Sequence, residues 1–153
     1  MVKRYDVHPN VHYQTLTQPG VDTTIEEEAT MFEPVPLGKN KVMIAELLKV
    51  VFDHDGAHAG TRLYTLVVLD GVTEKLLART REQFFVGAAG TEKSLSVERD
   101  LTDGQGNGVL LCKNPLLRYS TSTTGAASSG YFTLYWRYKE ITNTELVQML
   151  GGI

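Results

Sequence analysis

The sequence predicts an all-β domain, an antiparallel sandwich or barrel, and three observations favour that class. Residues 130–139 alternate strictly, with Phe132, Leu134 and Trp136 on one face, and an alternation with period two is typical of a half-buried strand. Similar short segments recur along the chain with turn residues between them, and no long helical pattern alternates with them. The 14 glycines and many serines and threonines supply the turns that such a fold needs.

Size and composition fit one ordinary globular domain. The chain has 153 residues, of which 42% are hydrophobic and 22% charged, and a chain of this length folds without a disulfide or metal to hold it together. The net charge of −3 gives no general attraction to nucleic acid, and Lys3-Arg4 is too small a basic group to change this. The single cysteine, Cys112, lies in an apolar run, which predicts a buried and inert thiol.

Targeting signals do not stand out in the sequence. The first residues lack the apolar core of a signal peptide. Apolar runs are interrupted by Glu46, Lys49 and Asp70, so none approaches the roughly 20 residues that a membrane span needs. We therefore expect a soluble protein that is made inside a cell.

The predicted organisation is an N-terminal arm, residues 1–22, followed by a β-sandwich domain, residues 23–153. The arm has turn signals at His8-Pro9-Asn10 and at Gln18-Pro19-Gly20 but no clean period. We interpret residues 22–30 as a strand, although its three glutamates could instead begin a helix capped by Thr23 or Thr24.

Residues 41–52 are the most ambiguous segment. An amphipathic helix would place Lys41, Glu46 and Lys49 on one arc. The β-branched and aromatic end, Val50-Val51-Phe52, favours one long strand. The remaining predicted strands are residues 61–69, 76–85, 93–101, 109–112, 116–120 and 130–139.

A short helix is predicted at the end of the chain, over residues 142–150. Thr142 and Glu145 have the spacing of a capping box. Leu146, Met149 and Leu150 would form one apolar stripe, and two glycines follow.

One dense cluster of metal-type ligands occurs, in the loop predicted after residue 52. His54, Asp55 and His58 together with Asp53 could hold zinc, manganese or iron. The Asp55-Gly56 pair is also a turn signal that explains the acidic residues without a metal, and we prefer that exposed turn. No serine-nucleophile motif or phosphate loop is present either. The sequence therefore assigns no catalytic residue, no cofactor and no bound metal, and we expect a protein that is not an enzyme.

The outer face of the last strand is the best candidate for contact with a partner. It carries Tyr131, Tyr135, Arg137 and Lys139, and tyrosine and arginine are enriched in protein–protein interfaces. Arg137 and Lys139 would also discourage unwanted edge pairing by this strand.

The order of these segments resembles a known family. The long segment 41–52 follows a proline-rich turn. Asn114-Pro115-Leu116-Leu117-Arg118 then leads through a small-residue loop to the aromatic segment 130–139 and the tail Glu140-Ile141-Thr142. This pattern is similar to the small single jelly-roll capsid proteins of viruses of archaea and bacteria. The resemblance implies a jelly roll of about eight strands in two sheets that packs with copies of itself.

The resemblance also implies a function. The chain would be a capsid subunit that self-assembles and contacts other capsid proteins, made in the host cytoplasm and located in the virion. The N-terminal arm would bind a neighbouring subunit or line the interior of the shell. Asp6, Asp22 and Glu26 to Glu28 outnumber Lys3 and Arg4, so an internal membrane or another protein between shell and genome fits better than direct genome binding by the arm.

Two other functions stay open from the sequence. One is a carbohydrate- or receptor-binding β-sandwich module, which would need exposed aromatic side chains on a sheet. The other is a metal-dependent jelly-roll enzyme that uses His54 and His58.

Overall fold

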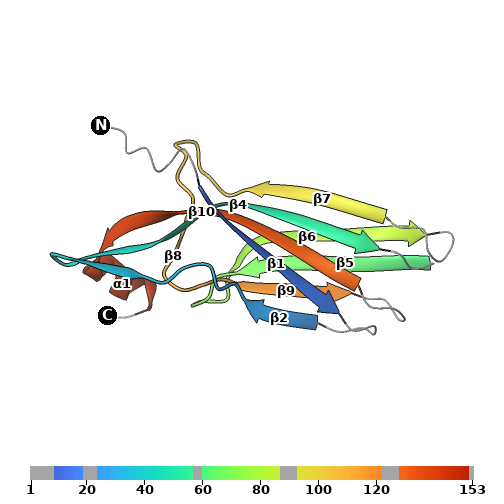
Figure 1. Ribbon diagram of the computed structural model, residues 1–153, viewed down its shortest axis with the longest axis horizontal. Helices are drawn as coiled ribbons and strands as arrows, with labels where there is room; N and C mark the ends of the chain where they lie inside the picture. Colours follow the sequence, from blue (N-terminus) through green and yellow to red (C-terminus); the bar gives the residue numbers. More distant parts are fainter. Residues whose placement is uncertain (1–8, 19–23, 57–59, 87–92, 122–127, 152–153) are drawn as a thin grey trace.

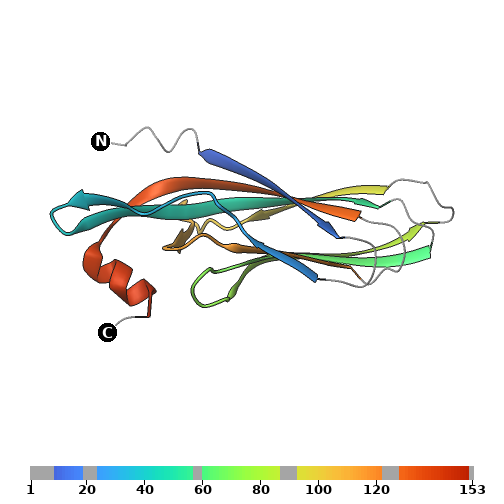
Figure 2. The same ribbon diagram turned by 60° about the horizontal axis from the view of Figure 1, so that its bottom comes forward.

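The computed structural model describes residues 9–18, 24–56, 60–86, 93–121 and 128–151. Their strands form two antiparallel sheets that lie face to face (Figures 1 and 2). One short helix, α1 (Asn143–Met149), lies at one end of the molecule. The strands are β1 (Asn10–Gln18), β2 (Thr24–Glu28), β3 (Val35–Gly38), β4 (Lys41–Gly56), β5 (Gly60–Leu69), β6 (Leu76–Val86), β7 (Lys93–Asp100), β8 (Val109–Leu111), β9 (Leu116–Thr121) and β10 (Ser128–Thr142).

The strand order defines a single jelly roll. The larger sheet runs β1-β10-β4, and the far side of β4 pairs in turn with β3, β8 and β7. The smaller sheet runs β2-β9-β5-β6. Four antiparallel pairs are therefore nested along the chain: β1 with β10, β2 with β9, β4 with β7, and β5 with β6. These eight strands, four from each sheet, are connected as in a jelly roll, which confirms the predicted fold class.

The core lies between the sheets and is built from alternate residues of the central strands. Phe132 and Leu134 of β10 lie opposite Phe52 and Val50 of β4, and all four are buried. Phe52 and Phe132 meet edge to face with centroids 5.7 Å apart, a favoured arrangement for aromatic rings. The predicted alternation of residues 130–139 is thus correct, and it continues through Trp136, which is buried in the same core, to Tyr138, which packs against it.

An irregularity in the pairing of β10 with β4 changes which side chains face the core. Tyr135 pairs with Lys49, but Trp136 pairs with Leu47, so Leu48 is an extra residue in β4. Such a bulge shifts one strand by one residue and exchanges its faces. Glu46 therefore lies outside the core, directly opposite Arg137.

The short helix forms where it was predicted. The Oγ1 of Thr142 accepts a hydrogen bond from the backbone N–H of Glu145 at 3.1 Å, which caps the helix. Leu146 and Met149 pack against the core, while Leu150 is exposed. None of the helices formed by the described residues has the length and apolar character required to cross a membrane.

Two predictions about the first half of the chain have different outcomes. Residues 41–52 form a strand and not a helix, and β4 continues to Gly56. The segment predicted as an arm, residues 1–22, contains a strand of the sandwich, because Asn10–Gln18 is β1 and pairs with β10 over its whole length. Residues 1–8 lie outside the described part of the chain.

Candidate interaction surface

The outer face of the larger sheet is made of side chains that the pairing register places in rows. Val11 of β1, Tyr135 of β10, Lys49 of β4 and Asp100 of β7 form one row. The next row contains Tyr13, Thr133, Val51 and Glu98, and a third contains Thr15, Tyr131, Asp53 and Ser96. The sheet therefore presents a continuous outer surface four strands wide.

The half of this surface on β1 and β10 carries no charge, and we call it the tyrosine–threonine half. Tyr13 is 72% exposed and Val11 is 40% exposed. Thr17 and Ser129 share a hydrogen bond between their hydroxyls at 2.9 Å. Its eight members are Val11, Tyr13, Thr15, Thr17, Ser129, Tyr131, Thr133 and Tyr135.

The half on β4 and β7 is charged. The Nζ of Lys49 lies 3.0 Å from Oε1 of Glu98 and 4.5 Å from the centre of the Tyr135 ring. The hydrogen bond to Glu98 raises the pKa of Lys49. Lys49 therefore stays charged and marks the border between the two halves.

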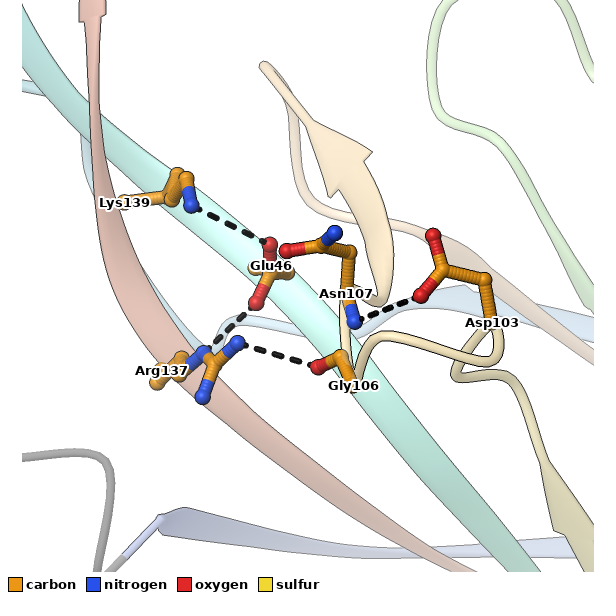
Figure 3. Close-up of polar contacts among 6 residues, drawn as sticks. All are labelled: Glu46, Asp103, Gly106, Asn107, Arg137 and Lys139. Atoms are coloured by element: carbon orange, nitrogen blue, oxygen red, sulfur yellow. Dashed lines mark hydrogen bonds and ion pairs between the residues drawn. The ribbon is translucent and has the colours of Figure 1, made fainter.

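A second polar group lies beyond the bulge, where the loop before β8 meets the sheet (Figure 3). Nε of Arg137 donates to Oε1 of Glu46 at 2.5 Å, and its Nη2 donates to the carbonyl of Gly106 at 3.1 Å. Lys139 lies 4.0 Å from the other oxygen of Glu46. The Glu46 side chain is 2% exposed and that of Arg137 is 16% exposed, so this ion pair is largely removed from water.

The loop that supplies Gly106 is held by Asp103. Oδ1 of Asp103 accepts a hydrogen bond from the backbone N–H of Gln105 at 2.8 Å. It also accepts one from the backbone N–H of Asn107 at 3.0 Å (Figure 3). These bonds to the ionised carboxylate lower the pKa of Asp103. The loop thereby keeps the carbonyl of Gly106 in place to accept the bond from Arg137.

The structure divides the four predicted interface residues into two pairs. Tyr131 and Tyr135 lie on the outer face of the sheet, as predicted. Arg137 and Lys139 are engaged with Glu46 of the same chain. β10 is also not an edge strand, because it pairs with β1 on one side and β4 on the other. A role for Arg137 and Lys139 in protecting a free edge is therefore wrong.

The weak metal candidates are not arranged as expected. His54 lies within β4, is buried, and has its ring centre 3.6 Å from that of Tyr64, with Tyr119 nearby. The expected exposed turn is thus wrong at this position. Asp55 is the next residue of β4, and His58 lies outside the described residues. In the described part of the chain, no three acidic, histidine or cysteine side chains are grouped to hold a metal ion.

An open groove of 690 Å³ lies beside the helix. Phe32, Cys112, Lys113, Leu146 and Leu150 are among the residues that line it. Cys112 is buried, as predicted, and burial raises the pKa of its thiol. The thiol therefore stays protonated and weakly reactive at neutral pH.

Two features of the surface were missed from the sequence. Val11 and Tyr13 were assigned to an arm, although Val11, Tyr13, Thr15 and Thr17 do alternate with His12, Gln14 and Leu16. The alternation is hard to recognise because two inner positions are polar. Glu46 lies on the outer face of the sheet, which only the bulge in the pairing with β10 reveals.

Comparisons with known proteins found similar solved structures at low sequence identity. No protein-family model matches the chain, and no curated protein matches it. Among solved structures, VP1 of Trichodysplasia spinulosa-associated polyomavirus in complex with 3'-sialyllactose is similar at 10% identity and a TM-score of 0.44, covering 87% of this chain and 97% of that chain. The VP1 pentamer of Human Polyomavirus 6 has 9% identity and a TM-score of 0.43, covering 86% and 96%. The unassembled KI Polyomavirus VP1 pentamer has 13% identity and a TM-score of 0.40, covering 82% and 76%.

These neighbours are viral capsid proteins. For this chain, the jelly roll itself follows from the strand order described above. The resemblance to capsid proteins of archaeal and bacterial viruses in particular stays a prediction.

Proposed function

We propose that this chain is a capsid subunit that self-assembles into a virion shell and has no enzymatic activity. The observation that carries the proposal is the tyrosine–threonine half of the outer sheet face. It belongs to a jelly roll, a fold that viral capsid domains use.

The chemistry of this half suits contact with another protein. The buried centres of protein interfaces are depleted in charged residues and enriched in tyrosine and other aromatic residues. Tyr13, Tyr131 and Tyr135 supply the aromatic side chains, and Val11 adds an exposed apolar one. We place the centre of the interface at these four residues. Arg137 and Lys139, which are bound to Glu46, would lie at its rim.

The partners in this proposal are copies of the same chain and other capsid proteins. Residues before β1 would contact a neighbouring subunit, an internal membrane or the genome. Among these, the acidic composition of the first 30 residues favours a contact other than direct genome binding. The protein would be located in the virion.

Light scattering and negative-stain electron microscopy of the purified chain test the proposal. We expect particles or closed oligomers, and we expect Tyr13→Ser to reduce their formation. Leu76→Ser is the matched control, because Leu76 is 46% exposed on β6 of the other sheet, and it should assemble as the wild type does.

A strict monomer at high concentration, across salt and pH, would refute the proposal. A monomer that binds glycans on an array, with binding lost in Tyr13→Ser, would instead favour the carbohydrate-binding alternative.

A further inference from the structure

The edge strands of the two sheets differ in how they are protected against pairing with another chain. Natural edge strands are usually short, charged, interrupted by proline or bulged. β2 carries three consecutive glutamates, and β3 contains Pro36 and is four residues long. β6 carries Arg79 and Arg81, β7 carries Glu98, Arg99 and Asp100, and β8 is three residues long.

β1 has none of these protections. It is nine residues long, with the sequence Asn-Val-His-Tyr-Gln-Thr-Leu-Thr-Gln, and contains no charged residue and no proline. Its pairing with β10 runs without a register shift, so no bulge twists it away. Within the described part of the chain, β1 pairs with a strand on one side only. It is therefore a ready template for another strand.

We propose that the free edge of β1 pairs with the β1 edge of a second copy, antiparallel and across a two-fold axis, so that the two larger sheets become one. This inference rests on the self-association proposed above and specifies how it occurs. A second copy fits because both edges are uncharged, so no like charges meet along the paired strands.

The geometry of antiparallel pairing extends the surface described above. Residues that lie directly opposite one another point to the same side of the sheet. The outer residues of one β1, such as Tyr13 and Thr15, therefore lie opposite outer residues of the other. The two tyrosine–threonine halves join into one continuous face, and tyrosine beside threonine is a favourable cross-strand neighbour.

The glutamates of β2, which lies close to this edge, oppose the pairing and make it depend on salt. Gln14 of β1 donates through Nε2 to Oε2 of Glu27 at 2.9 Å and to the carbonyl of Glu28 at 3.2 Å. β2 thus lies at the same edge of the sandwich, and pairing would bring the glutamates of two copies towards each other. Salt screens such repulsion, so association through β1 should strengthen as ionic strength rises.

Disulfide crosslinking tests the pairing directly. Single cysteines are introduced at Val11, Tyr13, Thr15 and Thr17 in a Cys112→Ala background, alone and in all pairwise mixtures. Opposite residues of antiparallel strands are about 4.5–5.5 Å apart at Cα, within the range that a disulfide bridges. When two copies of β1 pair antiparallel about a two-fold axis, the two residue numbers of every facing pair add up to the same sum. We therefore expect disulfides only between positions whose numbers add up to one shared value.

Charge variants provide a second measurement. Thr15→Lys places one lysine from each copy close together along the paired β1 edges. Because these like charges repel, we expect the association to weaken about tenfold. Ser96→Lys is the matched control, because Ser96 is also exposed on the outer face but lies on β7; it should leave association unchanged.

The outcomes separate the inference from the function on which it rests. Particles that form without links between β1 residues, or links with a constant difference in place of a constant sum, overturn the β1 pairing and leave the capsid proposal intact. An unchanged association of Thr15→Lys also overturns the pairing. A chain that scatters light as a monomer under all conditions overturns both.

Discussion

Replacement of Arg137 by methionine tests the ion pair with Glu46 most directly. The Glu46 side chain is 2% exposed and Arg137 is its shortest polar contact. Removal of one partner of a buried pair typically costs 3–5 kcal/mol, because the other charge stays buried without compensation. Lys139 remains 4.0 Å from Glu46, so we expect Arg137→Met to lower the free energy of unfolding by about 3 kcal/mol, at the low end of this range.

Two further variants separate the buried charge from simple loss of contact. Glu46→Leu with Arg137→Met removes both charges and should recover most of the lost stability, because apolar replacements of a whole buried pair are often neutral. Arg118→Met is the matched control. Arg118 pairs with Glu26 at 2.6 Å, but both side chains are more than a third exposed, and the loss of such a pair should cost less than about 1 kcal/mol.

Urea unfolding, followed by the fluorescence of Trp136, measures the free energy of unfolding of each of these variants. Trp136 is the single tryptophan of the chain and is buried, so its emission reports on the core. A cost below about 1 kcal/mol for Arg137→Met, or a double variant less stable than Arg137→Met alone, would refute the reasoning.

Three other predictions concern local geometry. Gly130→Ala should destabilise the fold by about 1–3 kcal/mol in thermal melts, because the added Cβ would lie 2.1 Å from Cδ2 of Tyr119; unchanged stability would contradict this contact. Asp103 has a lowered pKa, so its contribution to the loop is present above the ordinary aspartate value of 3.8 and is lost as pH falls through the lower folded value. The protection of the Asn107 amide against hydrogen exchange, corrected for intrinsic exchange, should fall over the same pH range. Asp103→Asn should remove this pH dependence. Thr142→Ala should reduce helix stability by about 1 kcal/mol, seen as faster amide exchange in α1.

The larger features of the fold could be predicted because they depend on short-range pattern. The alternation around Phe132 places its residues on two faces whatever strand lies beside them. The β-branched end of residues 41–52 correctly favoured a strand over a helix. The capping pair at Thr142 located the helix. Each of these signals is contained within about ten residues.

The missed features depend on partners that are distant in the sequence. Whether Arg137 faces a neighbour or Glu46 is decided by the pairing of β10 with β4 and by the extra residue Leu48. The turn signal Asp55-Gly56 does not end the strand, because β4 stays paired with β10 to Asp55 and with β7 to Gly56. His54 is accordingly in the core, where tertiary packing and not local preference places it.

The nested pairing of the strands has a consequence for the timing of folding. Among the described strands, β1 comes before all others in the sequence and its partner β10 comes after them, and contacts so distant in sequence form slowly because a long loop must close first. The nascent chain therefore exposes a β1 without this partner until β10 has been synthesised. We expect a chain truncated after residue 121 to stay unfolded or to aggregate in circular dichroism and sedimentation measurements. The full chain should refold in a slow phase of Trp136 fluorescence, on the scale of milliseconds to seconds. Under the function proposed above, a subunit could join a shell only after β10 has been added.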